Sequence, residues 1–73
     1  MIAEFLILCE NLRYLRAKKG LSKKEMAAKL NISIKDLTLL ENNEAPNRLS
    51  SDLLFNIKKE FNINPNEMFM LLY

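Results

Sequence analysis

Apolar residues recur every three or four positions along the first part of the 73-residue chain, which is the spacing of one face of an α-helix. This segment runs from about Ala3 to Lys19 and is expected to end at Gly20. Its apolar face consists of Phe5, Leu8, Cys9, Leu12 and Leu15. Three further apolar residues lie off that face: Leu6, Ile7 and Tyr14. The pattern therefore predicts a first helix that is either buried on several sides or covered by a partner.

A second, shorter helix is predicted by clear start and stop signals. Ser22 is a favourable N-cap, and Glu25 three residues later completes a capping box. Asn31 tolerates the left-handed backbone conformation that often ends a helix. The inner face between these signals consists of Met26, Ala27 and Leu30. The small side chain of Ala27 is expected where this helix crosses the next one.

A third helix is predicted after a turn of about three residues. Ser33 can cap it, the helix runs from Ile34 to Asn42, and Asn43 is a second left-handed stop. At 100° per residue, Leu37 and Leu40 lie on one side. The residues on the opposite side are Lys35, Thr38, Leu39 and Asn42. The spacing therefore predicts an apolar inner face and a mixed outer face.

A fourth helix is expected beyond the longest loop, which extends from Glu44 to Ser50. It starts after Ser50 or Ser51, and the residues that it buries are Leu53, Leu54, Ile57 and Phe61. Its helical spacing again predicts one apolar face that packs on the rest of the domain.

A fifth helix is expected at the carboxyl end. Asn64 is its N-cap, Pro65 occupies its first position, and its body is the apolar run from Met68 to Tyr73. No repeat, linker or low-complexity segment divides the chain. Residues 1–73 are therefore expected to form a single all-α domain of five helices.

The composition excludes several classes of function. Histidine is absent and Cys9 is the single cysteine, which excludes an internal disulfide, a His/Cys zinc site and a Ser-His or Cys-His catalytic pair. The acidic residues show no spacing typical of acid–base catalysis, and no small-molecule site is evident. The apolar runs are too short for a membrane helix, and the amino terminus lacks the basic region of a signal peptide. We expect a cytoplasmic, non-enzymatic protein without cofactor or metal, in which Cys9 belongs to the core.

The net charge of +2 hides a strong asymmetry. The segment from Arg13 to Lys35 contains eight basic residues and one acid, Glu25, whereas the remainder contains three basic and eight acidic residues. A block this polarised can form the positive surface that a polyanion requires. A basic run taken alone is also typical of a solvated helix face that has no partner.

Half of the chain carries a motif of known type. From Asn11 to Pro46 it reads NLRYLRAKKGLSKKEMAAKLNISIKDLTLLENNEAP, which contains the pattern LS-x-x-E-x-A-x-x-L, then I-S, then L-x-x-L-E-N before a loop proline. This stretch resembles the Xre-type, lambda-repressor-like helix-turn-helix family, and the later F-N-I-x-P-x-E segment is similar to that family's end. The resemblance implies a five-helix lambda-repressor-like fold whose second motif helix enters the major groove of DNA.

The resemblance also implies roles for individual residues. Lys23 matches a position that contacts phosphate or bases, and Asn42 matches one that binds backbone phosphate. The positions that match base-reading residues are Ile34, Lys35, Thr38 and Leu39. Arg16 and Glu41 match a pair that ties the domain together, so we interpret them as structural.

Two further observations bear on how this chain would bind DNA. Ile34 and Leu39 stand where glutamine or arginine is common, and apolar side chains cannot form bidentate hydrogen bonds to base edges, although they can touch thymine methyl groups. Lys23 and Lys24 oppose the helix dipole unless a phosphate binds beside them. The candidate DNA-binding residues are Lys23, Lys24, Ser33, Ile34, Lys35, Thr38, Leu39, Asn42 and Arg48.

Two functions from different classes fit these observations. The first is sequence-specific binding of double-stranded DNA by a transcriptional regulator, in which Lys23, Lys24, Asn42 and Arg48 hold phosphates. The second is a protein–protein interaction module that keeps the fold, as an antirepressor or regulatory subunit would. The excess of apolar residues at both ends predicts a homodimer through the first and fifth helices; the alternative is that these helices pack together within one monomer.

Overall fold

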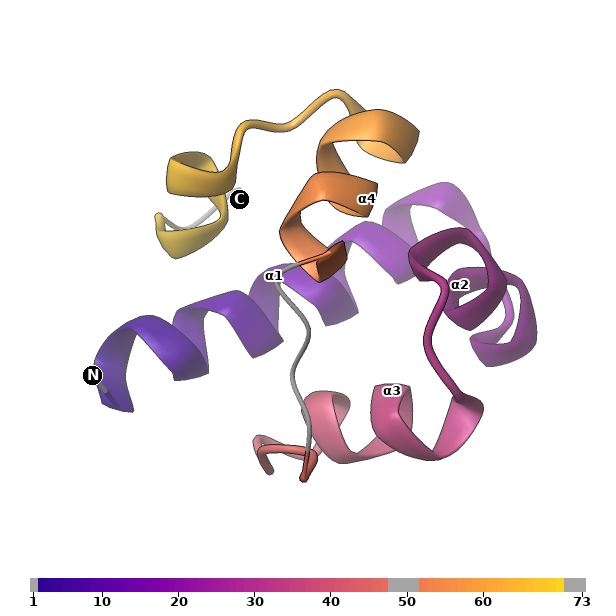
Figure 1. Ribbon diagram of the computed structural model, residues 1–73, viewed down its shortest axis with the longest axis horizontal. Helices are drawn as coiled ribbons and strands as arrows, with labels where there is room; N and C mark the ends of the chain where they lie inside the picture. Colours follow the sequence, from indigo (N-terminus) through magenta and orange to yellow (C-terminus); the bar gives the residue numbers. More distant parts are fainter. Residues whose placement is uncertain (1, 48–51, 71–73) are drawn as a thin grey trace.

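The computed structural model describes residues 2–47 and 52–70 (Figure 1). Its elements are α1 (Ile2–Lys19), α2 (Lys23–Leu30), α3 (Ile34–Glu41), α4 (Asp52–Phe61) and the 3₁₀ turn η1 (Pro65–Phe69). α1 packs against α3 and η1, α2 packs against α3 and α4, and α4 packs against η1. These contacts form a closed ring of elements, and α3 lies along one edge of it (Figure 1).

The apolar faces predicted from the helical spacing meet in one core. Leu8, Cys9, Leu12 and Leu15 of α1 are buried, and Phe5 packs against them while remaining partly exposed. The second and third helices contribute the predicted Met26, Ala27, Leu30, Leu37 and Leu40. Cys9 has no exposed surface, which confirms its role as a core residue. Burial of these side chains is the main stabilising contribution to the fold.

The helix ends follow the local signals. Ser22 Oγ accepts the amide of Glu25 at 3.0 Å, and the Glu25 carboxylate accepts the amide of Ser22 at 2.8 Å, which completes the predicted capping box. Asn31 and Asn43 adopt left-handed φ angles of 57° and 63° at the ends of α2 and α3. α3 ends at Glu41, one residue before the predicted Asn42.

Within the described residues, the predicted fifth helix is a 3₁₀ turn instead, and Leu71, Leu72 and Tyr73 of the prediction lie outside them. Asn64 and Pro65 form the expected start, and the backbone amide of Asn64 also donates to the Glu67 carboxylate at 2.9 Å. The turn ends at Phe69, and Met70 is extended with φ −125° and ψ 142°. The side-chain amide of Asn11 donates to the carbonyls of Met68 and Met70, both at 2.8 Å. These two bonds hold the carbonyls against α1 and favour the extended backbone over a further helical turn.

The fourth helix buries a narrower face than expected. Leu53 and Ile57 are fully buried, whereas Leu54 and Phe61 are half-buried at the edge of the core. The side-chain amide of Asn56 donates to the carbonyl of Leu30 at 2.9 Å and so fixes α4 to the end of α2. The predicted caps Ser50 and Ser51 lie outside the described residues. No described helix is both long enough and apolar enough to span a bilayer.

Candidate nucleic-acid interface

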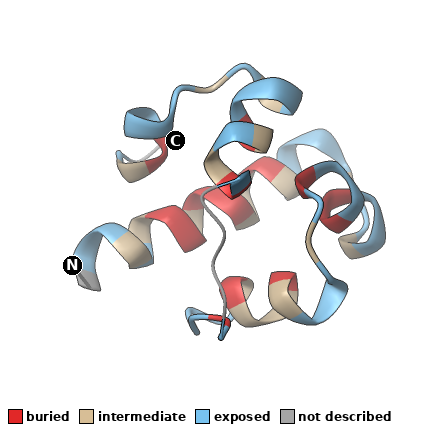
Figure 2. Ribbon diagram, viewed as in Figure 1, coloured by how far each residue is buried: buried red, intermediate tan, exposed pale blue. Residues whose placement is uncertain are grey.

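α3 lies at the surface with its two faces divided as the sequence predicted. Leu37 and Leu40 are fully buried, and Figure 2 shows buried residues on the side of α3 that faces the rest of the molecule. Ile34 and Lys35 are exposed, and Thr38 and Leu39 are half-buried. Ser33 caps the helix, because its Oγ accepts the amide of Asp36 at 3.0 Å. The outer face of α3 is therefore open to a large ligand.

An ion pair fixes α3 to α1. Arg16 donates through Nε and Nη2 to the two carboxylate oxygens of Glu41, at 2.6 and 2.9 Å, and through Nη1 to the carbonyl of Leu21 at 3.2 Å. Only 7% of the Glu41 side chain is exposed. The Glu41 carboxylate beside the guanidinium raises the pKa of Arg16 above its ordinary value. This bidentate contact agrees with the structural role that the resemblance implied for the pair, and it sets the position of α3.

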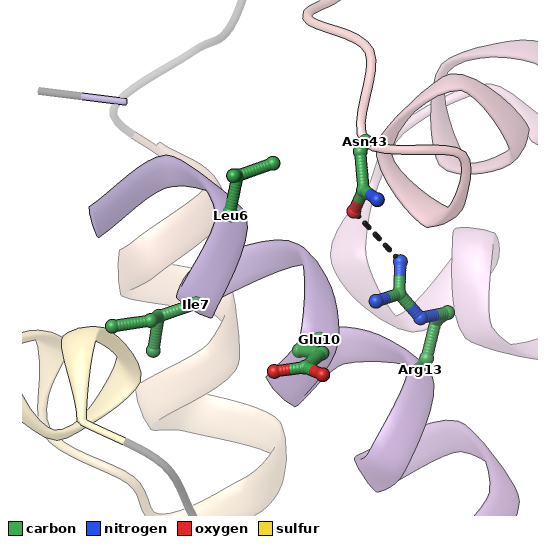
Figure 3. A pocket seen from close by; sticks show the side chains of 5 residues that line it. All are labelled: Leu6, Ile7, Glu10, Arg13 and Asn43. Atoms are coloured by element: carbon green, nitrogen blue, oxygen red, sulfur yellow. Dashed lines mark hydrogen bonds between the residues drawn. The ribbon is translucent and has the colours of Figure 1, made fainter. Parts of the chain in front are cut away.

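A second arginine, which the sequence analysis did not single out, holds the end of the same helix. Arg13 Nη1 donates to the backbone carbonyl of Glu41 at 2.7 Å and to Asn43 Oδ1 at 2.9 Å. Figure 3 shows the Asn43 bond at the edge of a hollow that Leu6, Ile7 and Glu10 also line. A cation at the carboxyl end of a helix is favourable because the last carbonyls carry partial negative charge. Arg13 thus orients the turn that follows Asn42.

The amino end of α2 comes close to the outer face of α3. Lys23 Nζ lies 3.5 Å from Thr38 Oγ1, which brings together two candidate residues that are 15 positions apart. Lys24 is exposed beside it. The capping hydrogen bonds from Ser22 lower the pKa of Glu25, so its carboxylate remains charged at neutral pH and partly offsets these two lysines.

The loop after α3 returns beside the helix. A hollow of about 530 Å³ is lined by Lys35, Asp36, Leu39, Ala45 and Asn47. Asp36, Ala45 and Asn47 were not among the candidate residues. Asp36 lies on α3 but outside its predicted outer face, and helical spacing does not predict how the loop that contains Ala45 and Asn47 folds back. Leu39 therefore faces a hollow at one side of the helix, whereas Ile34 is exposed on its first turn.

The basic block from Arg13 to Lys35 is not a uniform positive face. Arg13 and Arg16 hold α3, and Lys29 pairs with Glu60 at 3.7 Å. Lys18 Nζ lies 5.6 Å from the centre of the Tyr14 ring. Within the described residues, Lys24 and Lys35 have no hydrogen-bond or ion-pair partner, so these cations are available to a ligand.

The described candidate residues lie on α2, on α3 or directly beside α3. Asn42 is exposed just beyond α3, where its backbone amide donates to the backbone carbonyls of Thr38 and Leu39. The candidate Arg48 lies outside the described residues. Of the described candidates, Lys23 and Thr38 lie together and are half-buried, as is Leu39. The exposed candidates are Lys24, Ser33, Ile34, Lys35 and Asn42.

Comparison with known families agrees with this geometry. The family model described as helix-turn-helix matches residues 12–68, which is well over half of the chain. The chain belongs to this helix-turn-helix family. The match covers α2, α3 and the turn between them, and it confirms the Xre-type, lambda-repressor-like resemblance. No curated protein and no solved structure matches the chain. Membership of the helix-turn-helix family indicates DNA as a partner.

Proposed function

We propose that residues 1–73 form a single domain that binds double-stranded DNA in a sequence-specific manner and regulates transcription. The observation that carries this proposal is the open outer face of α3, which holds the unpaired Lys35 while Arg13 and Arg16 fix the helix from behind. A single helix of this kind fits the major groove, which is about 12 Å wide. Anchoring α3 in this way lowers the entropic cost of binding.

The proposed complex divides the candidate residues into two groups. Lys35 and Thr38 face base edges, with Ile34 and Leu39 adding apolar contacts. Lys23, Lys24 and Asn42 hold backbone phosphates on either side of α3, and Arg48 is assigned to the same group from the sequence alone. The proximity of Lys23 Nζ to Thr38 Oγ1 supports this division, because it places a phosphate-binding group directly beside the base-reading face.

Binding to a randomised duplex library over a range of salt concentrations tests this function. We expect binding at low salt that weakens as salt rises, and the Lys24→Ala variant should reduce the slope of log affinity against log salt by about 0.9, the effect of one lost phosphate contact. Lys59→Ala is the matched control, since Lys59 is an exposed lysine on α4 and should leave the slope unchanged. Failure of the wild-type chain to bind any duplex at low salt would contradict the proposal.

A protein–protein interaction module is the second candidate function. The observation that favours it is Ile34, whose side chain is 48% exposed on the first turn of α3, because exposed apolar groups are typical of partner sites. This candidate predicts no binding to duplex DNA even at low salt, so the same titration separates the two functions.

We propose in addition that two copies associate through the outer sides of α1 and η1. Within one chain these elements already pack together, as the Asn11 bonds to Met68 and Met70 show, so a dimer would use surfaces that remain exposed. Leu6 is 40% exposed and Met70 is 61% exposed. A two-fold pair would present two α3 helices to successive turns of DNA.

Analytical ultracentrifugation at micromolar concentration tests the dimer. We expect a species of twice the 8.5 kDa chain mass, and Leu6→Ser should convert it to monomer. Phe55→Ser is the control, because Phe55 is an exposed apolar residue on α4, which is not one of the two elements of the proposed interface. A monomeric wild-type chain would remove the proposal of self-association without affecting that of DNA binding.

A further inference from the structure

The outward side of α1 carries a regular stripe of residues that the core does not use. Ala3, Leu6, Glu10, Arg13 and Ala17 follow one another in alternating steps of three and four, which places them along one side of the helix. At 100° per residue, this side lies opposite the buried face of the same helix. The two alanines and Leu6 are exposed, whereas Glu10 and Arg13 are half-buried. A seven-residue spacing of this kind allows one helix to pack lengthwise against another.

The two charged residues of this stripe have binding capacity that the fold leaves free. Among the described residues, Glu10 forms no hydrogen bond or ion pair. Arg13 uses Nη1 for its bonds to the Glu41 carbonyl and to Asn43 Oδ1, so its Nε and Nη2 groups remain available. Figure 3 shows both side chains at a hollow of about 280 Å³ that Leu6 also lines. A carboxylate and a guanidinium are therefore open to a partner on the same side of α1.

The order of residues makes the stripe complementary to a second copy of itself that runs in the opposite direction. A two-fold axis placed between Glu10 and Arg13 brings Glu10 of each copy opposite Arg13 of the other. The same axis brings Leu6 opposite Ala17, so a large side chain faces a small one and the helices can approach closely. A parallel pair would instead place each charge opposite its like, which is unfavourable.

Resting on the dimer proposed above, we propose that α1 pairs in an antiparallel manner with α1 of a second copy, through two symmetric Glu10–Arg13 ion pairs and two Leu6–Ala17 contacts. Such an interface uses the same patch on both copies, as a two-fold dimer requires. The ion pairs fix the register and disfavour other alignments, while the apolar contacts contribute to affinity. Because Arg13 also holds the Glu41 carbonyl at the end of α3, this register determines how the two α3 helices are placed relative to each other.

Exchange of the two charges tests the ion pairs. Glu10→Arg and Arg13→Glu should each raise the dissociation constant of the dimer at least about tenfold, because each change places like charges opposite one another. An equimolar mixture of the two variants should again form dimers in the ultracentrifuge, since every facing pair in the mixed dimer joins an acid to a base. Recovery on mixing separates this effect from the loss of the bonds between Arg13 and α3. Glu4→Arg is the matched control, because Glu4 is an exposed acid of α1 outside the stripe.

Cross-linking measures the register and changes neither charged residue. Under mild oxidation, a mixture of Leu6→Cys and Ala17→Cys should form the mixed disulfide in preference to either symmetric one. In the proposed pair, the two copies of each position lie about 16 Å apart along the helix axis, too far for a disulfide. Cys9 has no exposed surface and does not compete.

The outcomes separate this inference from the dimer on which it rests. A monomeric wild-type chain overturns both the dimer and its register and leaves DNA binding untouched. If the wild type is dimeric but Glu10→Arg is equally dimeric, or if the mixed disulfide is not preferred, the register is overturned and the dimer stands on another surface. If circular dichroism shows that Arg13→Glu does not fold, Glu10→Arg and the mixed disulfide decide the question.

Discussion

At the scale of single residues, the contacts of Glu41 help to fix the position of α3. The Glu41 carboxylate binds Arg16 in a bidentate manner, and its backbone carbonyl accepts a hydrogen bond from Arg13. Because the carboxylate is 7% exposed, removing it leaves a partly buried guanidinium without its partner. The contacts of Glu41 with Arg13 and Arg16 thus determine how the outer face of α3 is presented.

We expect Glu41→Ala to lower the free energy of unfolding by about 2–3 kcal/mol, the usual effect of losing a charged hydrogen-bonded pair that is largely shielded from water. Urea denaturation at neutral pH measures this. Glu60→Ala is the matched control, since its pairing with Lys29 at 3.7 Å is exposed and should contribute no more than about 0.5 kcal/mol. Equal losses in the two variants would mean that the Arg16 pair does not anchor α3.

The buried side-chain amide of Asn11 leads to a second prediction at the scale of single residues. Asn11→Asp preserves the shape of the side chain but replaces the two N–H donors to Met68 and Met70 with an acceptor. We expect a loss of about 1–3 kcal/mol in unfolding free energy, with faster proteolysis of the segment after Phe61 than in the wild type. Proteolysis confined to α2 or α3 would contradict the assignment of Asn11 to the attachment of η1.

At the scale of elements, local signals predicted the helix ends, whereas the spacing of apolar residues did not predict the long-range contacts of Asn11. Ser22 with Glu25, and the left-handed Asn31 and Asn43, act within a few residues of their own positions, so the sequence indicates them directly. The hydrogen bonds of Asn11 to Met68 and Met70 join residues that are 57 and 59 positions apart. The spacing of apolar residues along a helix does not predict such a pairing. This difference explains why the sequence predicts a fifth helix where the structure has a 3₁₀ turn.

In the candidate interface too, the sequence predicted features that depend on one helix alone and did not predict those that depend on how the helices cross. The outward positions of Lys35 and Thr38 follow from the 100° turn per residue, as the sequence predicted. The approach of Lys23 to Thr38 and the hold of Arg13 on α3 depend on how the helices cross, which the spacing of apolar residues leaves open. The residues of the loop that line the hollow with Lys35 were missed for the same reason.

The capping box of α2 predicts a measurable dependence on pH. Hydrogen bonds from Ser22 hold the pKa of Glu25 below its ordinary value of 4.5, so the charged carboxylate stabilises the fold above that pH. This contribution is lost as the pH falls from 4.5 through the lower pKa of the folded state. We therefore expect the difference in unfolding free energy between the wild type and Glu25→Gln to be present at pH 7 and to vanish in strong acid. A difference that stays constant across urea titrations over this range would contradict the assignment.

At the scale of the whole molecule, the ring of elements places the edge that we propose for DNA binding apart from α4. α3 and the start of α2 form that edge, whereas the exposed lysines Lys58 and Lys59 lie on α4. Both regions carry positive charge, so electrostatic attraction alone does not distinguish them. Duplex DNA is expected to select the edge that contains α3, because Lys35 on α3 is proposed to read bases and Lys23 and Lys24 at the start of α2 are proposed to bind phosphates.

Mapping amide chemical shifts of the ¹⁵N-labelled chain during titration with a 20-base-pair duplex tests this central claim most directly. The account predicts that the largest changes occur at Lys23, Lys24 and residues 33–42, while the amides of Phe55 to Lys59 on α4 barely move. Changes concentrated on α4, or an unperturbed α3 in the presence of bound duplex, would contradict it.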